Sequence, residues 1–348
     1  MPTRKRIDWP AVAAAFAARI PHTALHPAAM LRAFAEYRRE ARKGGRPARW
    51  GLAFSGGADS LALLLIFWAD GPGRWERDFI AMHFNHRLRG KAADADEKFC
   101  RAVCAALGVA FVTGRWRKAP KGASAAEARA ARFDFFGREM RRRKIRLLWL
   151  AHQQDDIAES MLMRLARGSG TGGLAAPRPV QELGGGRLHL RPLLTLKKAA
   201  IVAALKKAGA TWREDASNAG DDHFRNRVRR HVLPAWARAA GRDAVAGAAL
   251  SRELLDEDDS ALEAWLDELK PLDRRGRLDL GRLAGKPRAL VRRALHRWLL
   301  AVRPETDLSR QGFNQLLAAV ERGRDTRFSL GARGFALVRR GGLVFRKD

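Results

Sequence analysis

Short apolar runs alternate with longer amphipathic segments in the first half of the chain. Four runs have the length of buried strands, at 50–54, 78–84, 109–113 and 145–151. The segments that separate and follow them have helical length and periodicity, at 61–69, 92–107, 124–143 and 155–167. Apolar strands separated by such helices are typical of βαβ units. The pattern therefore predicts an α/β fold with a parallel sheet, which binds ligands at the carboxyl ends of its strands.

Glycine and proline mark the limits of three predicted regions. The G-G-R-P breaker at 44–47 ends a helical pattern, so residues 1–47 are expected to form an N-terminal helical extension. Residues 48–235 then hold the α/β domain. Beyond it, 236–348 is expected to form a mainly helical domain with a few short strands in its tail.

The segments after residue 168 differ from the first half of the chain in composition and in the elements they predict. A stretch rich in Gly and Pro at 170–186 predicts a loop or a hairpin, and a helix is expected at 196–208. The chain after 235 is expected to stay helical through about Trp298, with a further helix near 308–321. Three short tail strands are predicted, at 326–330, 336–339 and 343–346.

The charge of the chain indicates a polyanionic partner. Sixty-seven Lys and Arg against 37 Asp and Glu give a formal net charge of +30. Such an excess is typical of proteins that bind nucleic acid or an anionic surface. A hydrophobic content of 47% excludes a disordered chain.

Membrane and disulfide-based classes are excluded. The longest apolar run, 61–69, is too short to span a bilayer. Cys100 and Cys104 are the only cysteines, which rules out a disulfide framework and a four-cysteine zinc site. This cysteine usage fits a reducing compartment, so we expect the protein in the cytoplasm.

A glycine-rich turn follows the first predicted strand and opens a helix. It reads S-G-G-A-D-S and consists of Ser55, Gly56, Gly57, Ala58, Asp59 and Ser60. Two glycines let the backbone approach an anion closely, and the helix N-terminus supplies partial positive charge to a phosphate. The serine hydroxyls can donate hydrogen bonds, and Asp59 can cap the helix or hold Mg²⁺. An ordinary capped turn is the alternative, but the position after the first strand favours phosphate binding.

Further motifs follow this loop along the chain. They are M-H-F-N-H-R-L-R-G at 82–90, E-A-R-A-A-R-F at 127–133, A-H-Q-Q-D-D-I-A-E-S at 151–160, R-G-S-G-T-G-G-L at 167–174, R-P-L-L at 191–194 and W-R-E-D-A-S-N…F-R-N-R-V-R over 212–229. In this order and spacing the set resembles tRNA(Ile)-lysidine synthetase, a family of PP-loop (N-type) ATP pyrophosphatases. The resemblance covers about residues 48–235, and the region after 240 matches only in general character.

The resemblance implies an activity as well as a fold. The fold would be a parallel-sheet PP-loop domain of the adenine nucleotide alpha hydrolase-like, Rossmann-like type, followed by a helical tRNA-binding domain. ATP and Mg²⁺ are the implied cofactors; free L-lysine and the isoleucine tRNA with a CAU anticodon are the implied partners. Lysine would be ligated to C2 of the wobble cytidine (position 34) through an adenylated cytidine, giving lysidine, AMP and pyrophosphate. The oligomeric state stays open, a homodimer included.

An acidic segment at a strand end carries the predicted amino-acid site. Asp156 and Glu159 share a helix face, and helix capping is the alternative explanation of such acidic residues. The resemblance implies that both carboxylates bind lysine, with Arg132 nearby, and that Asp59, His152 and Arg132 are catalytic. The family usually has two histidines here, and this chain has His152 followed by Gln153.

Two further groups complete the predicted site. A nucleotide or base pocket would use Asn85, His86, Arg89, Arg167 and Ser169. For the segment with Asn85, His86 and Arg89, the alternative is a loop whose side chains hydrogen-bond to its own backbone. For the glycine-rich segment with Arg167 and Ser169, the alternative is a flexible connector. A basic cluster is expected to contact tRNA phosphates, namely Arg225, Arg227, Arg229 and Arg230.

Two other functions remain as alternatives. One is a PP-loop tRNA thiolase, which would depend on catalytic or cluster-binding cysteines; Cys100 and Cys104 lack the C-x-x-C spacing. The other is a non-catalytic RNA-binding protein with a relict nucleotide pocket. The intact glycine-rich loop and acid pair argue against it.

Overall fold

The computed structural model describes residues 7–20, 24–25, 28–43, 49–69, 79–120, 122–214, 220–302, 308–331 and 334–347. Contacts divide the chain into two units, residues 1–253 and 254–348. This division lies beyond the boundary that the sequence places at 235. The reason is packing, because Leu233 and Ala248 share a buried cluster with Ala158 in the first unit.

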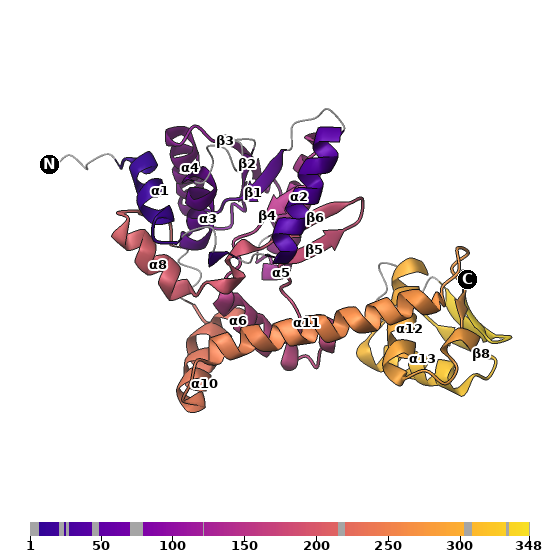
Figure 1. The fold of residues 1–348 in the computed structure, drawn as a ribbon. Coiled ribbons are helices and arrows are strands. Elements are labelled where there is room, and N and C mark those ends of the chain that lie inside the picture. Colours follow the sequence, from indigo (N-terminus) through magenta and orange to yellow (C-terminus); the bar gives the residue numbers. More distant parts are fainter. Residues whose placement is uncertain are drawn as a thin grey trace. The chain divides into compact units, whose positions relative to one another are not determined.

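The first unit is built on a six-stranded sheet (Figure 1). Its strands are β1 (Trp50–Ala53), β2 (Phe79–Asn85), β3 (Ala110–Arg115), β4 (Leu147–Trp149), β5 (Val180–Leu183) and β6 (Arg187–Leu190). Their order is β3-β2-β1-β4-β6-β5, with β5 antiparallel and the other strands parallel. The chain moves to opposite sides of β1 when it forms β2 and β4. The carboxyl end of β1 is therefore the point where such sheets open a binding crevice. The predicted α/β class is confirmed.

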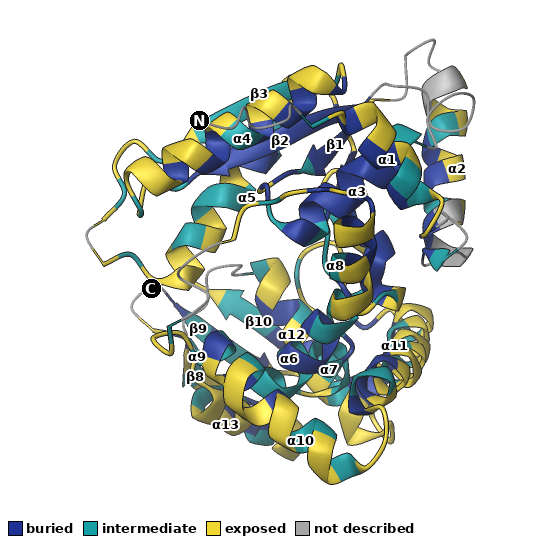
Figure 2. Ribbon diagram, turned by 90° about the vertical axis from the view of Figure 1, so that its left-hand side faces the viewer, coloured by how far each residue is buried: buried dark blue, intermediate teal, exposed yellow. Residues whose placement is uncertain are grey.

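Alternate strand residues enter two cores because side chains of a strand point to opposite faces. One face buries residues such as Leu52 and Trp149 against α3 (Ala58–Ala69), α4 (Lys91–Ala106) and α8 (Lys198–Lys207). The other face buries Met82 and Leu148 against α5 (Ala125–Arg142). Helix α3 is apolar on nearly all sides and is buried over most of its length (Figure 2). Such a helix belongs inside a domain rather than on its surface.

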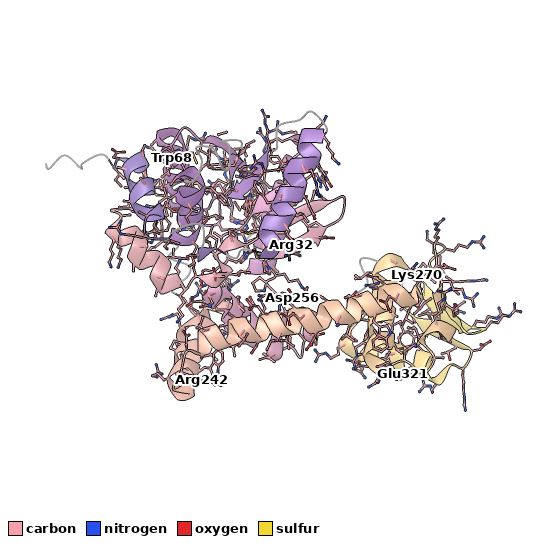
Figure 3. All side chains as sticks on the ribbon, in the orientation of Figure 1. Arg32, Trp68, Arg242, Asp256, Lys270 and Glu321 are labelled. Atoms are coloured by element: carbon pink, nitrogen blue, oxygen red, sulfur yellow. The ribbon has the colours of Figure 1, made fainter. Side chains whose placement is uncertain are left out.

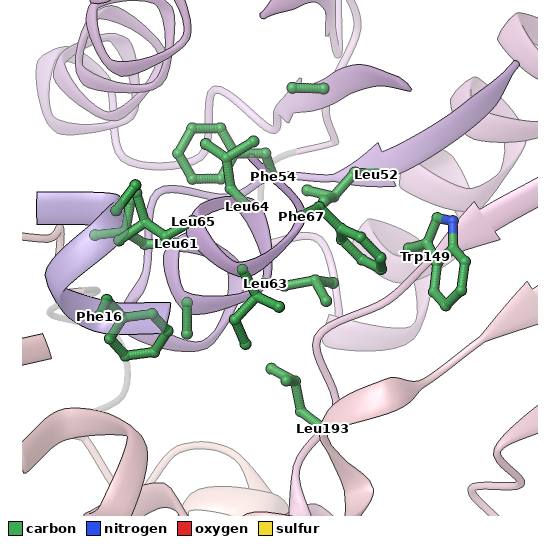
Figure 4. Close-up of a cluster of buried hydrophobic side chains, with 14 of the residues drawn as sticks. Phe16, Leu52, Phe54, Leu61, Leu63, Leu64, Leu65, Phe67, Trp149 and Leu193 are labelled. Carbon is green, nitrogen blue, oxygen red and sulfur yellow. The ribbon is translucent and has the colours of Figure 1, made fainter. Parts of the chain in front are cut away.

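The N-terminal helices are part of this first core. They are α1 (Trp9–Ala17) and α2 (Ala28–Lys43). Phe16 lies in one buried cluster with Leu61 and other side chains of α3 (Figure 4). The ring of Phe34 lies 5.0 Å from that of Trp50 and 5.7 Å from that of Trp149. The described residues of the predicted extension therefore contribute to the α/β core.

Shorter helices connect the sheet to the end of the unit. They are α6 (Gln154–Leu165), α7 (Thr171–Leu174), the 3-10 turn η2 (Pro192–Thr195), α9 (Phe224–Arg227), the π-helical turn η4 (Val228–Val232) and α10 (Leu233–Ala240). Gly241 then takes a left-handed conformation (φ 61°) before α11 (Ala244–Leu269) begins. The stretch that was predicted as a loop or hairpin, 170–186, contains β5 and the turn after it, while the partner strand β6 lies just beyond its end.

The second unit combines helices with a small antiparallel sheet. After α11 come β7 (Leu278–Asp279), η5 (Gly281–Leu283), α12 (Arg288–Val302), α13 (Arg310–Arg322), β8 (Thr326–Ser329), β9 (Phe335–Arg339) and β10 (Gly342–Arg346). The strand order is β7-β10-β9-β8. Trp298, Leu316 and Val338 lie in its core. Polar side chains such as Lys270 and Glu321 lie on its surface (Figure 3).

The prediction of continuous helix through Trp298 is wrong. Helix α11 ends where Lys270 takes a φ of 44° and Pro271 follows. Proline cannot continue a helix because it lacks the N–H donor and its ring clashes with the preceding turn. Helix α12 starts afresh at Arg288. Within the described ranges, no helix is both long and apolar enough to cross a membrane.

Candidate active site

The glycine-rich loop lies at the carboxyl end of β1 and is closed by its own serines. Ser60 Oγ donates to the Gly57 carbonyl at 3.0 Å and accepts from the Ser55 N–H at 3.2 Å. Gly56 has a φ of 87°, which side-chain-bearing residues rarely adopt, and a Cβ there would lie 3.0 Å from Cys100 Sγ. The loop therefore needs glycine at this position, and it leads directly into the first turn of α3, where backbone N–H groups lack helical partners.

A cleft of about 1470 Å³ opens over this loop. It brings together many of the predicted site residues, namely Ser55, Gly57, Ala58, Asp59, Ser60, Asn85, His86, Arg89, Arg132, His152, Glu159 and Arg229. Other predicted residues are not part of its wall, namely Gly56, Asp156, Arg167, Ser169, Arg225, Arg227 and Arg230. All of the wall residues belong to the first unit.

Asp59 is paired with a lysine that the sequence analysis did not identify. Lys198 Nζ lies 2.7 Å from Asp59 Oδ1, and the Lys198 N–H donates to Asp155 Oδ2 at 2.9 Å. Burial raises the pKa of the Asp59 carboxyl, and the ion pair with Lys198 opposes this. Lys198 thus places a cation beside the glycine-rich loop. The two residues are 139 positions apart, so no local pattern indicates the pair.

Helix α6 begins with a capping box that uses one oxygen of Asp156. Asp156 Oδ2 accepts from the Gln153 N–H at 2.9 Å, and Gln153 Oε1 accepts from the Asp155 N–H at 2.6 Å. These bonds satisfy donors that a helix start leaves free. Gln153 therefore has a capping role. The other oxygen of Asp156 remains for a cation.

The acid pair binds two arginines of the predicted tRNA-contacting cluster. Arg225 donates to Asp156 Oδ1 at 2.5 Å and to Glu159 Oε2 at 2.7 Å. Arg229 donates to Glu159 Oε1 at 2.5 Å. Glu159 is 1% exposed, so it needs such charge-assisted partners. Residues predicted for lysine and residues predicted for tRNA are thus bound to each other.

A cationic guanidinium and a neutral imidazole, those of Arg132 and His152, line the same cleft as Glu159. Burial, together with repulsion from Arg129 and Arg225, lowers the pKa of Arg132 to about 10. Burial, with Arg191 next in effect, lowers the pKa of His152 well below its usual value, so its ring is neutral at pH 7. His152 Nδ1 is buried without a hydrogen-bond partner among the described residues.

The loop after β2 is held largely by its own hydrogen bonds. Asn85 Nδ2 donates to Asp94 Oδ1 at 2.8 Å and to Glu97 Oε2 at 3.1 Å. Its Oδ1 accepts from the Arg87 N–H at 2.9 Å. The hydrogen bonds of Asn85 therefore fit the alternative interpretation, in which this segment is held by its own contacts. Asn85 also lines the cleft.

Arg89 belongs to a network that reaches the glycine-rich loop. It lies 2.7 Å from Asp96 Oδ2, and Arg213 Nε lies 2.7 Å from Asp96 Oδ1. The Arg213 N–H donates to the Gly56 carbonyl at 2.9 Å. Arg213 and Asp96 both line the cleft and were not singled out from the sequence. Arg213 lies in the quoted W-R-E-D motif, which was the available signal.

The glycine-rich segment after α6 is an ordered turn. The Ser169 N–H donates to the Arg164 carbonyl at 3.0 Å, and Arg164 Nη1 donates to the Gly173 carbonyl at 2.6 Å. A Cβ on Gly173 would lie 2.8 Å from Ser169 Cβ, which explains the glycine. Arg167 is exposed beside this turn.

The remaining arginines of the basic cluster bind Asp221. Arg227 donates to the Asp221 carbonyl at 2.7 Å, and Arg230 pairs with its carboxylate at 2.9 Å. Both side chains are exposed. Among the described residues, no three His, Cys, Asp or Glu side chains form a metal-binding group. Asp59 is the one carboxylate of the glycine-rich loop.

A sheet whose strand order reverses at β1, with a glycine-rich loop, Lys198 and the buried Glu159 lining one cleft, defines an α/β nucleotide-binding protein. Residues 30–236 match the model of the PP-loop domain, so the chain belongs to the PP-loop family. The family prediction is confirmed, and membership implies ATP binding.

Curated relatives show to which members of this family the chain is similar. The chain is 35% identical over 280 residues to a tRNA(Ile)-lysidine synthase of Geobacter sulfurreducens, covering 76% of this chain and 57% of that protein. It is 38% identical to one of Chlorobaculum tepidum, covering 53% of this chain and 55% of the relative. The chain thus spans about half the length of these relatives. Among solved structures, the U34-tRNA thiolase NcsA of Methanococcus maripaludis aligns with a TM-score of 0.48 and 15% identity, covering 64% of this chain and 79% of that one.

Proposed function

We propose that the protein ligates lysine to C2 of the wobble cytidine of the CAU-anticodon isoleucine tRNA, with ATP converted to AMP and pyrophosphate. An adenylated cytidine is the intermediate, and lysidine is the product. The observation that carries this proposal is that the glycine-rich loop and Glu159 line one cleft, with Asp156 joined to Glu159 through Arg225. Similarity to proteins named tRNA(Ile)-lysidine synthase supports the same reaction.

The proposed reaction begins with activation of the base. The C2 oxygen of cytidine is a poor leaving group, and transfer of AMP to it turns it into a good one. Backbone N–H groups of the loop, the hydroxyls of Ser55 and Ser60 and the ammonium of Lys198 supply donors and positive charge for the departing pyrophosphate. We assign Asp59 as one ligand of Mg²⁺, whose other ligands would be phosphate oxygens and water, as is usual for this ion.

Lysine then attacks C2 and AMP leaves. We assign Asp156 and Glu159 to its ammonium groups and Arg132 to its carboxylate or to a phosphate. In the described structure Arg225 and Arg229 already pair with the two carboxylates. Lysine must therefore displace guanidinium groups, and tRNA phosphates can draw these groups away. His152, as a neutral imidazole, can accept a proton from the attacking amine.

The remaining assignments concern the tRNA. We assign Asn85, His86, Arg89, Arg167 and Ser169 to the nucleotide or base. Arg225, Arg227, Arg229 and Arg230, together with the C-terminal domain, are assigned to tRNA phosphates. This function belongs to the cytoplasm, where the tRNA is modified.

A thiolase reaction has less support. Cys100 and Cys104 are both fully buried in α4, within the core cluster behind the sheet. Burial raises the pKa of both thiols, that of Cys104 to about 12. Thiolate chemistry needs an accessible sulfur of lowered pKa.

Lysine incorporation tests the proposal directly. Purified protein is incubated with ATP, Mg²⁺, radiolabelled lysine and the CAU-anticodon isoleucine tRNA, and acid-precipitable label and AMP are measured together. Initiator methionine tRNA, which shares the anticodon, is the control. We expect label and AMP in a one-to-one ratio with the isoleucine tRNA alone. AMP without bound lysine would contradict the ligase reaction.

A further inference from the structure

A second cavity lies outside the cleft, with a volume of about 370 Å³. One wall is a face of α5, and the other is the β5–β6 hairpin with the residue that follows it. Its lining residues are Arg129, Phe133, Asp134, Gly137, Met140, Arg141, Gln181, Leu183, Arg187, His189 and Arg191. We call this space the hairpin pocket. Arg129 lines both the hairpin pocket and the cleft, so the two spaces are neighbours.

Two guanidinium groups converge in this pocket over a glycine. Arg141 Nη1 and Arg187 Nη1 lie 3.5 and 3.8 Å from the position that a Cβ on Gly137 would take. Among the described residues, neither guanidinium forms an ion pair with a carboxylate. Asp134, the carboxylate of the lining, is paired with Arg138. Like charges held this close favour a shared anion.

A buried arginine adds a third cation. Arg191 is 4% exposed, and its Nη atoms donate to neutral oxygens, the Arg178 carbonyl at 2.8 Å and Gln181 Oε1 at 2.6 Å. Its Nε is buried and has no hydrogen-bond partner among the described residues. A buried charge without a counter-ion is costly. An anion in the pocket would compensate it.

The pocket also has an apolar side. The Phe133 and His189 rings lie 5.3 Å apart, and the Arg129 guanidinium lies 4.5 Å from the Phe133 centroid. Met140 and Leu183 complete this wall. Burial, followed by the nearby arginines 191, 129 and 187, lowers the pKa of His189 to about 4. The imidazole is therefore neutral at pH 7, and an anion that enters the pocket would raise its pKa.

We propose that the hairpin pocket binds the phosphate group of a nucleotide, at a site separate from the glycine-rich loop. The convergence of Arg141, Arg187 and Arg191 carries the proposal, and a volume above 300 Å³ is adequate for a small ligand. A free nucleotide and a nucleotide within an RNA strand share this chemistry. Planar guanidinium groups suit the oxygens of either.

NMR titration of His189 in the whole protein tests the site. The pKa of His189 is measured without ligand and then, in separate samples, with uridine 5′-monophosphate or with a single-stranded RNA of 12 uridines. A bound phosphate must raise the pKa of His189, because it stabilises the imidazolium. A rise with the mononucleotide identifies a free nucleotide as ligand, and a rise with the RNA alone identifies a strand. No rise with either ligand overturns the proposal.

A double variant gives an independent readout. The double variant Arg141→Ala, Arg187→Ala should bind the ligand that raises the pKa of His189 with an affinity lower by about tenfold or more, because two charged hydrogen bonds are lost. Arg142→Ala removes one charge at the next position of α5, outside the pocket, and should weaken binding less than twofold. Retained affinity for the ATP analogue shows that each variant is folded. Equal ligand affinities of the double variant and the wild type contradict the proposal.

Discussion

Asp156 divides its two oxygens between structure and chemistry. One oxygen caps α6 and the other lies against Arg225. Asparagine keeps an acceptor for the cap but loses the charge that holds a cation. The capping and the cation-binding interpretations of this residue are therefore compatible.

Asp156→Asn is expected to separate the two proposed half-reactions. Adenylation should persist, since the loop and Lys198 are unchanged, whereas lysine transfer should fall by about 100-fold because the ammonium loses a charged partner. Pyrophosphate release and lysine incorporation are measured in parallel. Asp155→Asn, which alters the neighbouring carboxylate bonded to the Lys198 N–H, is the matched control. Wild-type lysine transfer by Asp156→Asn would show that the amino-acid site is misassigned.

Asp59→Asn is expected to stop the first half-reaction. It removes the proposed Mg²⁺ ligand and the partner of Lys198, so AMP release should fall by about 100-fold. Affinity for tRNA should change little, because a neutral side chain replaces one that makes no proposed RNA contact. AMP assays and filter binding measure the two effects. Asp258→Asn, on the exposed side of α11, controls for charge, and a shared loss of activity in both variants would argue against a specific role.

At the scale of elements, Glu97 on α4 joins β2 and β3. It accepts from Asn85 and from Arg115, and it is 3% exposed. Burial opposes ionisation, but hydrogen bonds from Arg115, Asn85 and Arg101 prevail and lower its pKa from 4.5 to about 2. A carboxyl whose pKa is lower in the folded state stabilises the fold above its unfolded pKa.

This pKa shift predicts a pH-dependent stability. The contribution is complete above pH 4.5 and is lost as the pH falls toward 2. Its size is on the order of 2 kcal/mol, since Arg115 is half-exposed and solvent screens the pair. Urea unfolding at pH 7 and pH 3 measures it. Glu97→Gln should be less stable than wild type at pH 7, and the difference should shrink at pH 3. A difference that is the same at both pH values would contradict this account; Glu257→Gln on exposed α11 is the control.

Elements with a strong local pattern could be predicted, and long-range pairings could not. The first four strands and α3 to α6 follow runs and periodicities that are visible in the sequence. Strand β6 was missed because Arg187–Leu190 is only four residues long, and its pairing with β4, from Leu147 to Leu188, joins residues far apart in the sequence. The glycine-rich loop was found because its φ and its place after β1 demand glycine. Lys198 and the Arg225–Glu159 pair are tertiary contacts without any sequence spacing to reveal them.

At the scale of the whole molecule, a net charge of +30 predicts that phosphate contacts supply most of the affinity for the proposed tRNA substrate. Within the basic cluster, Arg225 and Arg229 differ from Arg227 and Arg230 because they form ion pairs with the acid pair. Their side chains are 37% and 41% exposed, so a polyanion can compete for them. Binding of tRNA would then uncover the two carboxylates for lysine.

This competition predicts that tRNA and lysine bind cooperatively. In the absence of tRNA, Arg225→Ala should bind lysine more tightly than wild type, because one competing cation is gone. The same variant should bind tRNA more weakly, and the slope of log affinity against log salt should fall by about one. Calorimetry with lysine and filter binding over a salt series measure the two affinities.

Arg227→Ala is the control that distinguishes competition from a general loss of charge. Arg227 lies on the same short helix but donates to the Asp221 carbonyl, away from the acid pair. It should lose tRNA affinity to a similar extent and leave lysine affinity unchanged. If both variants bind lysine as the wild type does, the Arg225 guanidinium does not compete with the ammonium. A cation that occupies a binding site must weaken the binding of a second cation to that site. Unchanged lysine affinity would therefore show that Asp156 and Glu159 form a structural ion-pair network and do not bind lysine.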